Sequence, residues 1–373
     1  MAVGVDLVTG ALGFSASHVI RHLLARGRKV VGLDLPNALD NASRKAMLAT
    51  TGIDWDHPDL TLVPGNLLQP ASLDAAFALP VERVFHVASL YDYSASLERL
   101  RAVNVHGTIH LVEKVLDHGV DRFVHWSTCG VFGKPYPARF RGKNNLPFSE
   151  SSSSPRNAPM GAEGPEGTHL VNAYSVSKWE QEQFIWQMHR EEGLPATVIR
   201  PAPIYGPGSD YGHGGIILAI ARGWLPAIPK DARNYITASV HVEDLARFGC
   251  AIAERADAVG EDYNVVDNSI VSYHEFLHYI ALLTGRRLID LPFVTQSMIR
   301  PVFQGLAWAW TEAERRMGIP RVRVLEVQSA TYMASSYWLS NRKSLSTGFE
   351  YVYPEVREGL KDTVAWMQEV GWL

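Results

Sequence analysis

The chain has 373 residues, 46% of them hydrophobic and 20% charged, and its formal net charge is −4. Such a chain can bury a sizeable core in one large domain or two joined ones, and its charge gives no reason to expect nucleic acid or an anionic membrane as a partner. No apolar run reaches the roughly 18 residues that a membrane-spanning helix needs.

The cysteines and the N-terminus bear on the compartment. Cys129 and Cys250 are far apart in the sequence and make neither a disulfide framework nor a metal cluster. They fit a reducing compartment. The first apolar segment begins a few residues after Met1, which leaves no room for a signal peptide. We therefore expect a cytoplasmic protein.

Apolar segments that suit β-strands alternate with helical patterns up to residue 200. The expected strands are residues 5–8, 29–34, 60–63, 83–88, 122–127 and 196–200. Helical patterns follow the first strand and cover residues 44–50, 71–79, 97–118 and 174–192. This alternation predicts an α/β fold with a Rossmann-type, doubly wound parallel sheet, in which ligands lie beyond the carboxyl ends of the strands.

A glycine turn follows the first strand. Its Gly10, Gly13 and Ala16 are spaced as in a variant of the dinucleotide fingerprint, whose backbone N–H groups approach a pyrophosphate at a helix N-terminus. Asp34 ends the second strand, about 20 residues after Gly13, where the fingerprint has the acidic residue that binds the adenosine ribose. Together these residues predict a dinucleotide site.

Two further patterns suit proton transfer. Tyr174 and Lys178 stand four residues apart at the start of a predicted helix, so they share one face, and a neighbouring ammonium favours a phenolate. Ser127 and Thr128 follow the fifth strand, where a hydroxyl can bond a substrate oxygen. The ordinary structural interpretations are an amphipathic helix for the first pattern and a strand-end turn for the second.

These segments, taken in order, resemble an extended short-chain dehydrogenase/reductase, in the group that includes NAD-dependent sugar epimerases/dehydratases and 3β-hydroxysteroid dehydrogenases. The matching segments are residues 9–14, 34, 66–67, 86–89, 104–108, 127–133, 174–178, 200–201, 205–208 and 241–244. Their order and spacing across almost the whole chain carry the resemblance.

The resemblance implies an enzyme and assigns roles to its residues. Tyr174 would be the general acid/base, Lys178 would bind the nicotinamide ribose and activate the tyrosine, and Thr128 would be the catalytic hydroxyl, with Ser127 as a second candidate. The cofactor would contact Tyr174, Lys178, Gly10, Gly13, Phe14, Asp34, Asn66, Leu67 and Ala88.

The expected cofactor is NAD, and no metal ion is expected in the site. The carboxylate of Asp34 would repel the 2′-phosphate of NADP, and neither Leu35 nor Pro36 supplies a compensating cation. His18 and His22 have a spacing that could bind a metal, but no third ligand is evident.

The substrate is a small molecule of one of two classes. We favour a 3β-hydroxysteroid dehydrogenase-like enzyme that oxidises a secondary alcohol on a steroid-like or other apolar substrate, or reduces the ketone. The alternative is a nucleotide-sugar epimerase or dehydratase with tightly bound NAD. A non-catalytic NAD-binding regulator is less favoured, because Tyr174, Lys178 and Thr128 are all present.

The second half of the chain decides between these classes. Pro203 stands where sugar-nucleotide members usually have an asparagine that binds the diphosphate, and the arginine that they usually carry shortly before the strand ending in His241 is missing. A diphosphate needs cations or hydrogen-bond donors, so these differences favour an apolar substrate. Arg222 or Arg233 could still substitute.

The expected domain division lies near residue 200. Residues 1–200 would form the NAD-binding Rossmann domain with the Tyr/Lys helix, and residues 201–373 mainly a substrate-binding region, with some elements returning to the first domain. Large apolar side chains at 298–310 predict a buried or pocket-lining helix. Residues 134–171 suit a surface loop or a flap over the site. The resemblance also implies a homodimer through the helices at 97–118 and 174–192.

Overall fold

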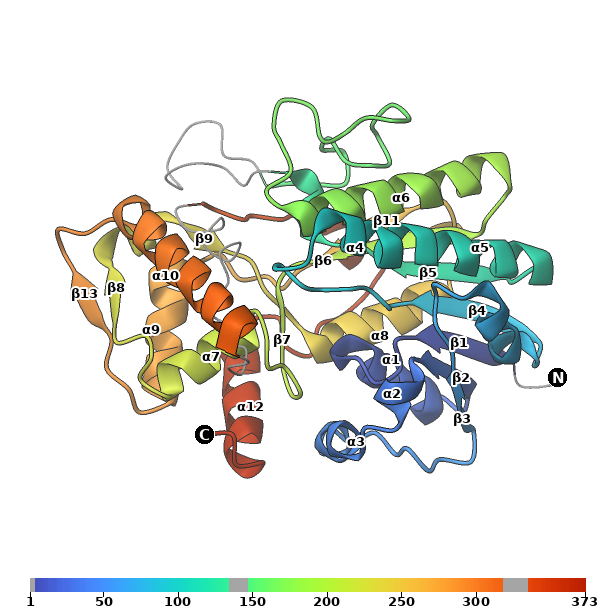
Figure 1. Ribbon diagram of the computed structural model, residues 1–373, viewed down its shortest axis with the longest axis horizontal. Coiled ribbons are helices and arrows are strands. Elements are labelled where there is room, and N and C mark those ends of the chain that lie inside the picture. Colours follow the sequence, from blue (N-terminus) through green and yellow to red (C-terminus); the bar gives the residue numbers. More distant parts are fainter. Residues whose placement is uncertain (1–3, 134–146, 318–334) are drawn as a thin grey trace.

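A seven-stranded parallel sheet forms the centre of the protein (Figure 1). The computed structural model describes residues 4–133, 147–317 and 335–373. In sheet order the strands are β11 (Asp262–Val265), β6 (Ala196–Pro201), β5 (Arg122–Trp126), β4 (Val81–His86), β1 (Val5–Thr9), β2 (Lys29–Asp34) and β3 (Leu60–Pro64). Each neighbouring pair is parallel, which confirms the predicted Rossmann-type sheet. The strand order reverses between β1 and β4, where such sheets place their ligands.

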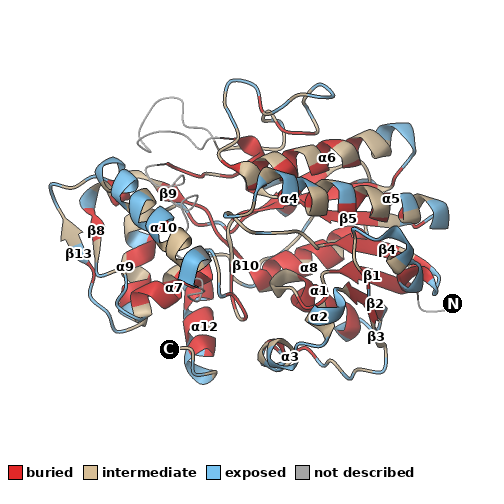
Figure 2. Cartoon of the chain, viewed as in Figure 1, coloured by how far each residue is buried: buried red, intermediate tan, exposed pale blue. Residues whose placement is uncertain are grey.

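Helices cover both faces of this sheet, and its strands are largely buried except for the edge strand β3 (Figure 2). One face packs against α1 (Phe14–Ala25) and α8 (Val242–Ala253), and the other against α5 (Gly107–His118) and α6 (Ala173–Glu191). Successive strand residues alternate between the two cores: Val8 and Phe85 belong to the first, and Leu7 and Val84 to the second. This burial explains why the strands are near-continuous apolar runs.

The expected helix at 97–118 is interrupted. It consists of α4 (Leu97–Arg101), a π-helical turn η2 (Ala102–His106) and α5. Within the turn the buried amide of Asn104 accepts the N–H of Leu90 at 2.7 Å and donates to Ser177 Oγ at 3.0 Å. The wider turn thus carries a side chain that ties α6 to the segment after β4, as π-turns at functional sites often do.

Two other expectations about helices also change in detail. Residues 70–77 form a 3₁₀ helix, η1 (Pro70–Phe77), because the hydroxyl of Ser72 bonds back to the backbone of Asn66 and Gln69. Residues 36–58 hold two helices rather than one, α2 (Pro36–Leu39) and α3 (Ala42–Ala49). Pro36 starts the first, and Asn41 caps the second by accepting the N–H of Arg44 at 2.9 Å.

Short elements after residue 201 form a second group beside the sheet (Figure 1). Three two-stranded pairs join β7 (Ile204–Tyr205) with β10 (Val240–His241), β9 (Ile236–Thr237) with β12 (Val271–Ser272), and β8 (Ala227–Pro229) with β13 (Ile289–Leu291). A separate core cluster holds residues of α7 (His213–Ala221), β8, α9 (Tyr273–Leu283) and α12 (Val356–Glu369). The remaining elements are η3 (Cys129–Phe132), η4 (Lys230–Asn234), η5 (Ala256–Ala258) and α11 (Arg342–Ser346).

The helix expected at 298–310 is present as α10 (Gln296–Met317). The expectation that it is buried is wrong, and the alternative that it lines a pocket stays a prediction. Met298, Val302 and Leu306 form a stripe at i, i+4 spacing and are 60%, 59% and 61% exposed (Figure 2). Small Ala307 is buried instead, so α10 turns a narrow side toward the protein and its apolar face outward. In the described part of the chain, no helix combines the length and the apolar character needed to cross a membrane.

The loop expected at 134–171 is described only from residue 147. Trp179 of α6 donates its indole N–H to the carbonyl of Ala162 at 2.7 Å. Arg156 forms ion pairs with Asp262 at 2.5 Å and Glu261 at 3.1 Å. This part of the segment is therefore fastened to α6 and β11, while residues 134–146 lie outside the described residues. A flap over the site stays a prediction.

Candidate active site

The glycine turn lies between β1 and α1, at the carboxyl edge of the sheet. Gly10 has a φ of 72° and donates its N–H to Leu33 O at 2.7 Å, and Gly13 N–H bonds Gly10 O at 2.7 Å. A Cβ on Gly10 would lie 3.1 Å from the Cα of Ala88, and one on Gly13 would lie 2.8 Å from Gly10 O. Ala88 is held there by its N–H bond to Thr9 Oγ1 at 3.0 Å. The turn therefore requires glycine at both positions.

The N-terminus of α1 follows this turn directly. Its N-cap is Gly13, which offers no side chain to bond the first N–H groups of the helix. Phe14 begins the helix and packs edge-on against His18, at 5.9 Å between ring centroids. The His18 ring also hydrogen-bonds Pro207 O at 3.0 Å, so the loop at 205–208 closes over this end of α1. The helix thus presents its dipole and N–H groups to an anion.

Asp34 lies against the same turn. Its Oδ2 accepts the N–H of Leu12 at 2.8 Å and its Oδ1 accepts the N–H of Leu35 at 2.8 Å. Burial raises the pKa of Asp34, although these N–H groups and the nearby Arg44 oppose that rise. Arg44 donates its Nε–H to Leu12 O at 3.2 Å. It is a cation of this site that sequence analysis missed, because it lies on α3, ten residues after Asp34 in the sequence.

An open hollow of about 680 Å³ continues from Asp34 across the ends of β2 and β3. Its lining residues are Leu35, Pro36, Asn37, Pro64, Gly65, Asn66, Gln69 and Ser72. Asn66 accepts the N–H of Leu68 through its Oδ1 at 3.0 Å. The neighbouring Leu67 is held by a hydrogen bond between its carbonyl and the His110 ring at 2.7 Å. The two residues predicted to contact adenine therefore lie one strand beyond the predicted ribose acid.

Tyr174 and Lys178 stand on the first turns of α6, which Asn172 caps by accepting Ser175 N–H at 2.8 Å. Both side chains are buried, and Lys178 is only 1% exposed. Its Nζ donates to the carbonyl of Trp126 at 2.7 Å and to Gln181 Oε1 at 2.5 Å. Burial lowers the pKa of Lys178 to about 7, against the opposing effect of the Glu182 carboxylate.

The two hydroxyl candidates lie in different surroundings. Ser127 is buried, and its Oγ donates to Glu182 Oε2 at 2.5 Å, a carboxylate that also forms an ion pair with Arg200. Thr128 is half-buried and caps η3, accepting the N–H of Gly130 through its Oγ1 at 3.2 Å. The Ser127 hydroxyl is therefore part of the buried ion-pair network, whereas the Thr128 hydroxyl lies outside this network, at the end of β5.

A buried chain of hydrogen bonds, which sequence analysis missed, links Lys178 to β1. Gln181, the partner of Lys178, donates from Nε2 to Thr108 Oγ1 at 2.6 Å. Thr108 Oγ1 and Thr9 Oγ1 then hydrogen-bond the two ring nitrogens of His86, at 2.8 and 2.9 Å. Burial lowers the pKa of His86 to about 3, so its ring is neutral at neutral pH. The sequence signal was the 86–89 motif, but its partners come from distant elements.

Four tyrosines, named here the four-tyrosine cluster, gather where Tyr174 lies. The ring of Tyr174 is 4.9 Å from that of Tyr91 and 5.8 Å from that of Tyr93. Tyr211 lies 4.8 Å from Tyr91 and 6.1 Å from Tyr93. These residues come from the segment after β4, from α6 and from the segment before α7, so only the folded chain brings them together. Sequence analysis singled out Tyr174 alone.

A comparison with known families decides what this site belongs to. The model of the NAD dependent epimerase/dehydratase family matches residues 7–265, well over half of the chain. The chain belongs to this family. It is accordingly an NAD-dependent oxidoreductase, and the predicted family, enzyme class and cofactor are confirmed.

The relatives of this epimerase/dehydratase family member are named for different substrates. It is 24% identical over 338 residues to the 3-beta-hydroxysteroid dehydrogenase of Mycolicibacterium neoaurum, covering 87% of this chain and 82% of that one. It is 24% identical over 375 residues to a putative dihydroflavonol 4-reductase of Synechocystis, covering 98% and 95%. The solved UDP-glucose 4-epimerase of Thermotoga maritima, with UDP-glucose, has a TM-score of 0.70 at 21% identity, covering 98% and 99%, and shows the shared fold.

The residues of this family member fit NAD. The missing Cβ of Gly10 leaves the turn close to Ala88, and the N-terminus of α1 offers N–H groups where the pyrophosphate of such cofactors lies. Asp34 presents a carboxylate beside that turn, and the hollow lined by Asn66 follows it. The order of these features across the sheet is that of a dinucleotide laid over the strand ends.

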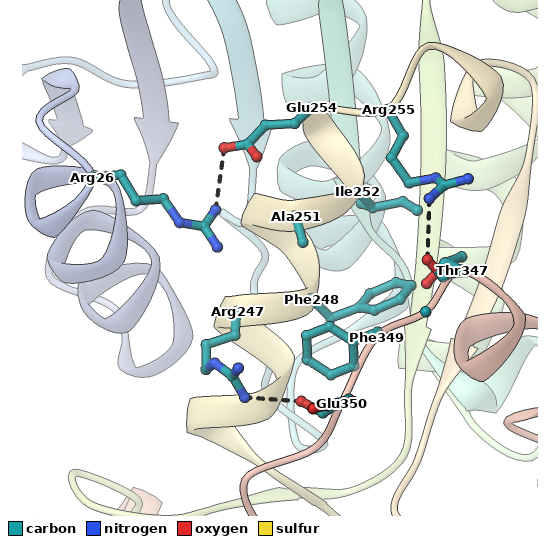
Figure 3. A pocket seen from close by; sticks show the side chains of 11 residues that line it. Arg26, Arg247, Phe248, Ala251, Ile252, Glu254, Arg255, Thr347, Phe349 and Glu350 are labelled. Carbon is teal, nitrogen blue, oxygen red and sulfur yellow. Dashed lines mark hydrogen bonds and ion pairs between the residues drawn. The ribbon is translucent and has the colours of Figure 1, made fainter.

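A second open hollow, of about 420 Å³, lies away from these features (Figure 3). It is next to Arg26, at the far end of α1, so roughly 18 Å of helix separates it from the glycine turn. Arg26 donates to Glu254 at 3.4 Å, and Arg255 donates to Thr347 O at 3.1 Å. These arginines thus join α1, α8 and the segment at 347–350. Because it lies so far from the glycine turn, this hollow is not the cofactor site of the enzyme.

Proposed function

We propose that this enzyme transfers a hydride between NAD and a secondary alcohol or ketone on a steroid-like or other apolar substrate. The observation that carries this proposal is the four-tyrosine cluster. Rings of Tyr91 and Tyr93 lie within 6 Å of the ring of Tyr174. Apolar pockets with a few placed polar groups are typical of sites for such ligands, and aromatic rings supply large contact surfaces.

Arg200 and Arg222 are engaged elsewhere, and Arg233, the other arginine that could hold a sugar diphosphate, lies 3.6 Å from Asp290. Arg200 is buried in ion pairs with Glu182 and Asp262, each at 2.5 Å. The guanidinium of Arg222 lies over the ring of Trp224 at 5.3 Å. A diphosphate needs such cations, and each of them would have to leave a partner to bind it. This arrangement supports an apolar substrate over a nucleotide sugar.

The roles that we propose follow from the positions of the side chains. Tyr174 would exchange a proton with the substrate oxygen, and Thr128 would donate a hydrogen bond to the same oxygen. We prefer Thr128 to Ser127 because the Ser127 hydroxyl is held by Glu182. Lys178 would bind the nicotinamide ribose and support Tyr174. When bound, NAD supplies the hydride acceptor or donor.

The cofactor contacts that we propose are those expected from the sequence. Gly10, Gly13 and Phe14 would flank the pyrophosphate, and Asp34 would bind the adenosine ribose. Asn66 and Leu67 would contact adenine, and Ala88 would lie along the cofactor. Each of these residues lies at the carboxyl edge of the sheet or directly beyond it, from β1 to β3 and β4.

A substrate comparison tests the proposal. Purified protein is incubated with NAD and a 3β-hydroxysteroid, and in parallel with a panel of UDP-, dTDP- and GDP-sugars. We expect net NADH with the steroid and no conversion of any sugar. Conversion of a sugar without net NADH would instead identify an epimerase or dehydratase and contradict the proposal.

A variant of the cluster sharpens this test. Tyr91 is 45% exposed, so Tyr91→Ala removes a ring from the site without opening the core. We expect a raised KM for the steroid and an unchanged affinity for NAD. The control is Tyr279→Phe on α9, a ring that faces Arg357 instead. Equal steroid KM values for the wild type and Tyr91→Ala would contradict the assignment of the cluster to the substrate.

A further inference from the structure

A second group of chemically suited side chains lies in the group of elements after residue 201, where α9 meets β13 (Figure 1). His274 and His278 stand one turn apart on α9, and Asp290 is the middle residue of β13. One ligand atom from each of the three lies within 4.8 Å of the other two. Among the residues that the structure describes, no other set of three or more His, Cys, Asp or Glu side chains meets this condition.

Both imidazoles aim at the same carboxylate. The Nε2 of His274 is 2.9 Å from Asp290 Oδ1 and 3.0 Å from Oδ2, and the Nε2 of His278 is 2.9 Å from Oδ1. Their ring centroids are 4.2 Å apart. Ligands around a tetrahedral Zn²⁺ at about 2.0–2.1 Å are about 3.3 Å apart. Each imidazole nitrogen is therefore within a few tenths of an ångström of the separation from the carboxylate oxygen that two Zn²⁺ ligands have.

The three side chains are also open to an incoming ion. Their exposed fractions are 21% for His274, 35% for His278 and 34% for Asp290. The three side chains are therefore partly exposed. Their elements are held in place, because α9 packs into a core cluster and β13 pairs with β8. Two histidines at i, i+4 on a helix with a carboxylate from a second element form a donor set that zinc sites use.

We propose that His274, His278 and Asp290 bind one divalent transition-metal ion, for which Zn²⁺ is the fitting choice, with water as a fourth ligand. Imidazole nitrogen suits zinc, copper and nickel, and a carboxylate completes a site that carries one negative charge. The proposal concerns a site distinct from the hydride-transfer site and does not depend on the identity of the substrate.

Arg233 is the cation that faces this carboxylate now. Its Nη2 lies 3.6 Å from Asp290 Oδ2, the oxygen that His274 also contacts at 3.0 Å, while both histidines contact Oδ1. The Arg233 side chain is 47% exposed, and its Nε–H donates to Lys230 O at 2.9 Å. At 3.6 Å the contact with Asp290 is longer than a hydrogen bond, and the exposed guanidinium can be solvated by water when an ion takes the carboxylate.

Another pair of histidines with this helical spacing shows why spacing alone is insufficient. His18 and His22 stand at i, i+4 on α1, but the ring of His18 is buried and bonds Pro207 O. His22 lies 2.9 Å from Glu243, and Arg21 forms an ion pair with the same carboxylate. The Arg21 guanidinium thus already pairs with the carboxylate that a metal ion at His22 would need. This makes His22 a matched control for the site on α9.

The ion would join two elements that are far apart in neither sequence nor space, α9 and β13. It would fasten β13, and with it β8, to α9. Asp231 lies in the same η4 segment as Arg233 and accepts the N–H of Gln296, the first residue of α10, at 3.0 Å. We expect Zn²⁺ to slow amide hydrogen exchange in β13, at residues 289–291, whereas Asp231 holds the start of α10 independently of the ion.

The test is equilibrium dialysis of the full-length, tag-free protein against Zn²⁺, followed by metal analysis. We expect one Zn²⁺ per chain, a higher Tm in the presence of Zn²⁺, and visible Co²⁺ bands of the intensity that marks tetrahedral coordination. Each of His274→Gln, His278→Gln and Asp290→Asn should lower the Zn²⁺ affinity at least about tenfold, since loss of even an outer-shell partner costs that much.

The control and the Zn²⁺-free Tm distinguish loss of the site from loss of the fold. His22→Gln should bind Zn²⁺ as the wild type does. Because His278 is partly exposed, its glutamine variant should keep the Zn²⁺-free Tm of the wild type while losing the Zn²⁺-dependent rise. Zn²⁺ binding that is absent from the wild type, or equally strong in all three site variants, would overturn the proposal.

Discussion

Lys178 donates a hydrogen bond from its Nζ to the carbonyl oxygen of Trp126, at 2.7 Å. Trp126 ends β5 and Lys178 lies on α6, so this bond joins the strand edge to the helix that carries Tyr174. The ammonium that makes this bond is buried, and burial lowers the pKa of Lys178 to about 7. The charge of Lys178 is therefore sensitive to pH near neutrality.

The first prediction concerns the pH dependence of stability. At pH values between about 7 and 10.5, the unfolded chain holds the Lys178 proton and the folded chain has released it. The free energy of unfolding should therefore rise with pH in this window, by up to about 1.4 kcal/mol per pH unit. Below pH 7 the full penalty of a buried charge remains. Urea denaturation of the cofactor-free protein at several pH values measures this slope.

A lysine-to-methionine comparison isolates the residue. Lys178→Met should lose the rise relative to the wild type, because methionine does not titrate. Lys361→Met is the control, since that side chain is exposed on α12 and should keep the wild-type slope. Identical slopes for the wild type and Lys178→Met would contradict the lowered pKa.

The second prediction concerns the general acid/base. Tyr174→Phe removes one hydroxyl and keeps the ring that contacts Tyr91 and Tyr93. We expect kcat to fall about 10²- to 10⁴-fold, the range for loss of a positioned acid/base, with NAD affinity unchanged. Steady-state kinetics and fluorescence titration with NADH measure the two quantities. A variant with nearly full turnover would refute the role that we propose for Tyr174.

The third prediction concerns cofactor choice. Asp34→Ser removes a carboxylate that accepts the N–H groups of Leu12 and Leu35. If the carboxylate binds the ribose, loss of this charged hydrogen bond should lower kcat/KM for NAD about 10- to 100-fold. The nearby Arg44 should then improve kcat/KM for NADP, since the repulsion of its 2′-phosphate is gone. The exposed Asp40 offers Asp40→Ser as a control, which should leave the NAD/NADP ratio unchanged. An unaltered ratio in Asp34→Ser would count against the ribose assignment.

The fourth prediction concerns the buried ion pairs behind the site. Burial opposes the charge on Arg200, but the Glu182 and Asp262 carboxylates outweigh it and raise its pKa. Glu182→Gln leaves this guanidinium short of one carboxylate, so we expect a loss of about 3–5 kcal/mol in the free energy of unfolding. Denaturant titration measures the loss.

Glu180 is a matched control for that variant, two residues away on α6. It forms an ion pair with Arg101 at 2.5 Å on the protein surface. Glu180→Gln should therefore cost no more than about 1 kcal/mol, as exposed pairs do. Comparable losses in the two variants would show that burial does not govern the energy of these pairs.

The sequence by itself determined the parts of the protein that depend on short-range order. The six strands expected up to residue 200 lie within about two residues of β1 to β6, because strands of a covered parallel sheet are near-continuous apolar runs. The glycine turn could be predicted because the backbone conformation and the close contacts at Gly10 and Gly13 leave no room for a side chain. Tyr174 and Lys178 were placed on one turn of a helix because a period of 3.6 residues dictates it.

Only the tertiary structure decided which side chains meet across elements. Tyr91 contacts Tyr174 and Tyr211, although both lie more than 30 residues away from it in the sequence. Asp290 reaches the histidines of α9 from a strand. The exposure of the apolar face of α10 was likewise decided by the tertiary structure. An apolar stripe such as Met298, Val302 and Leu306 records a helical period, but whether another element covers it depends on packing that no local pattern contains.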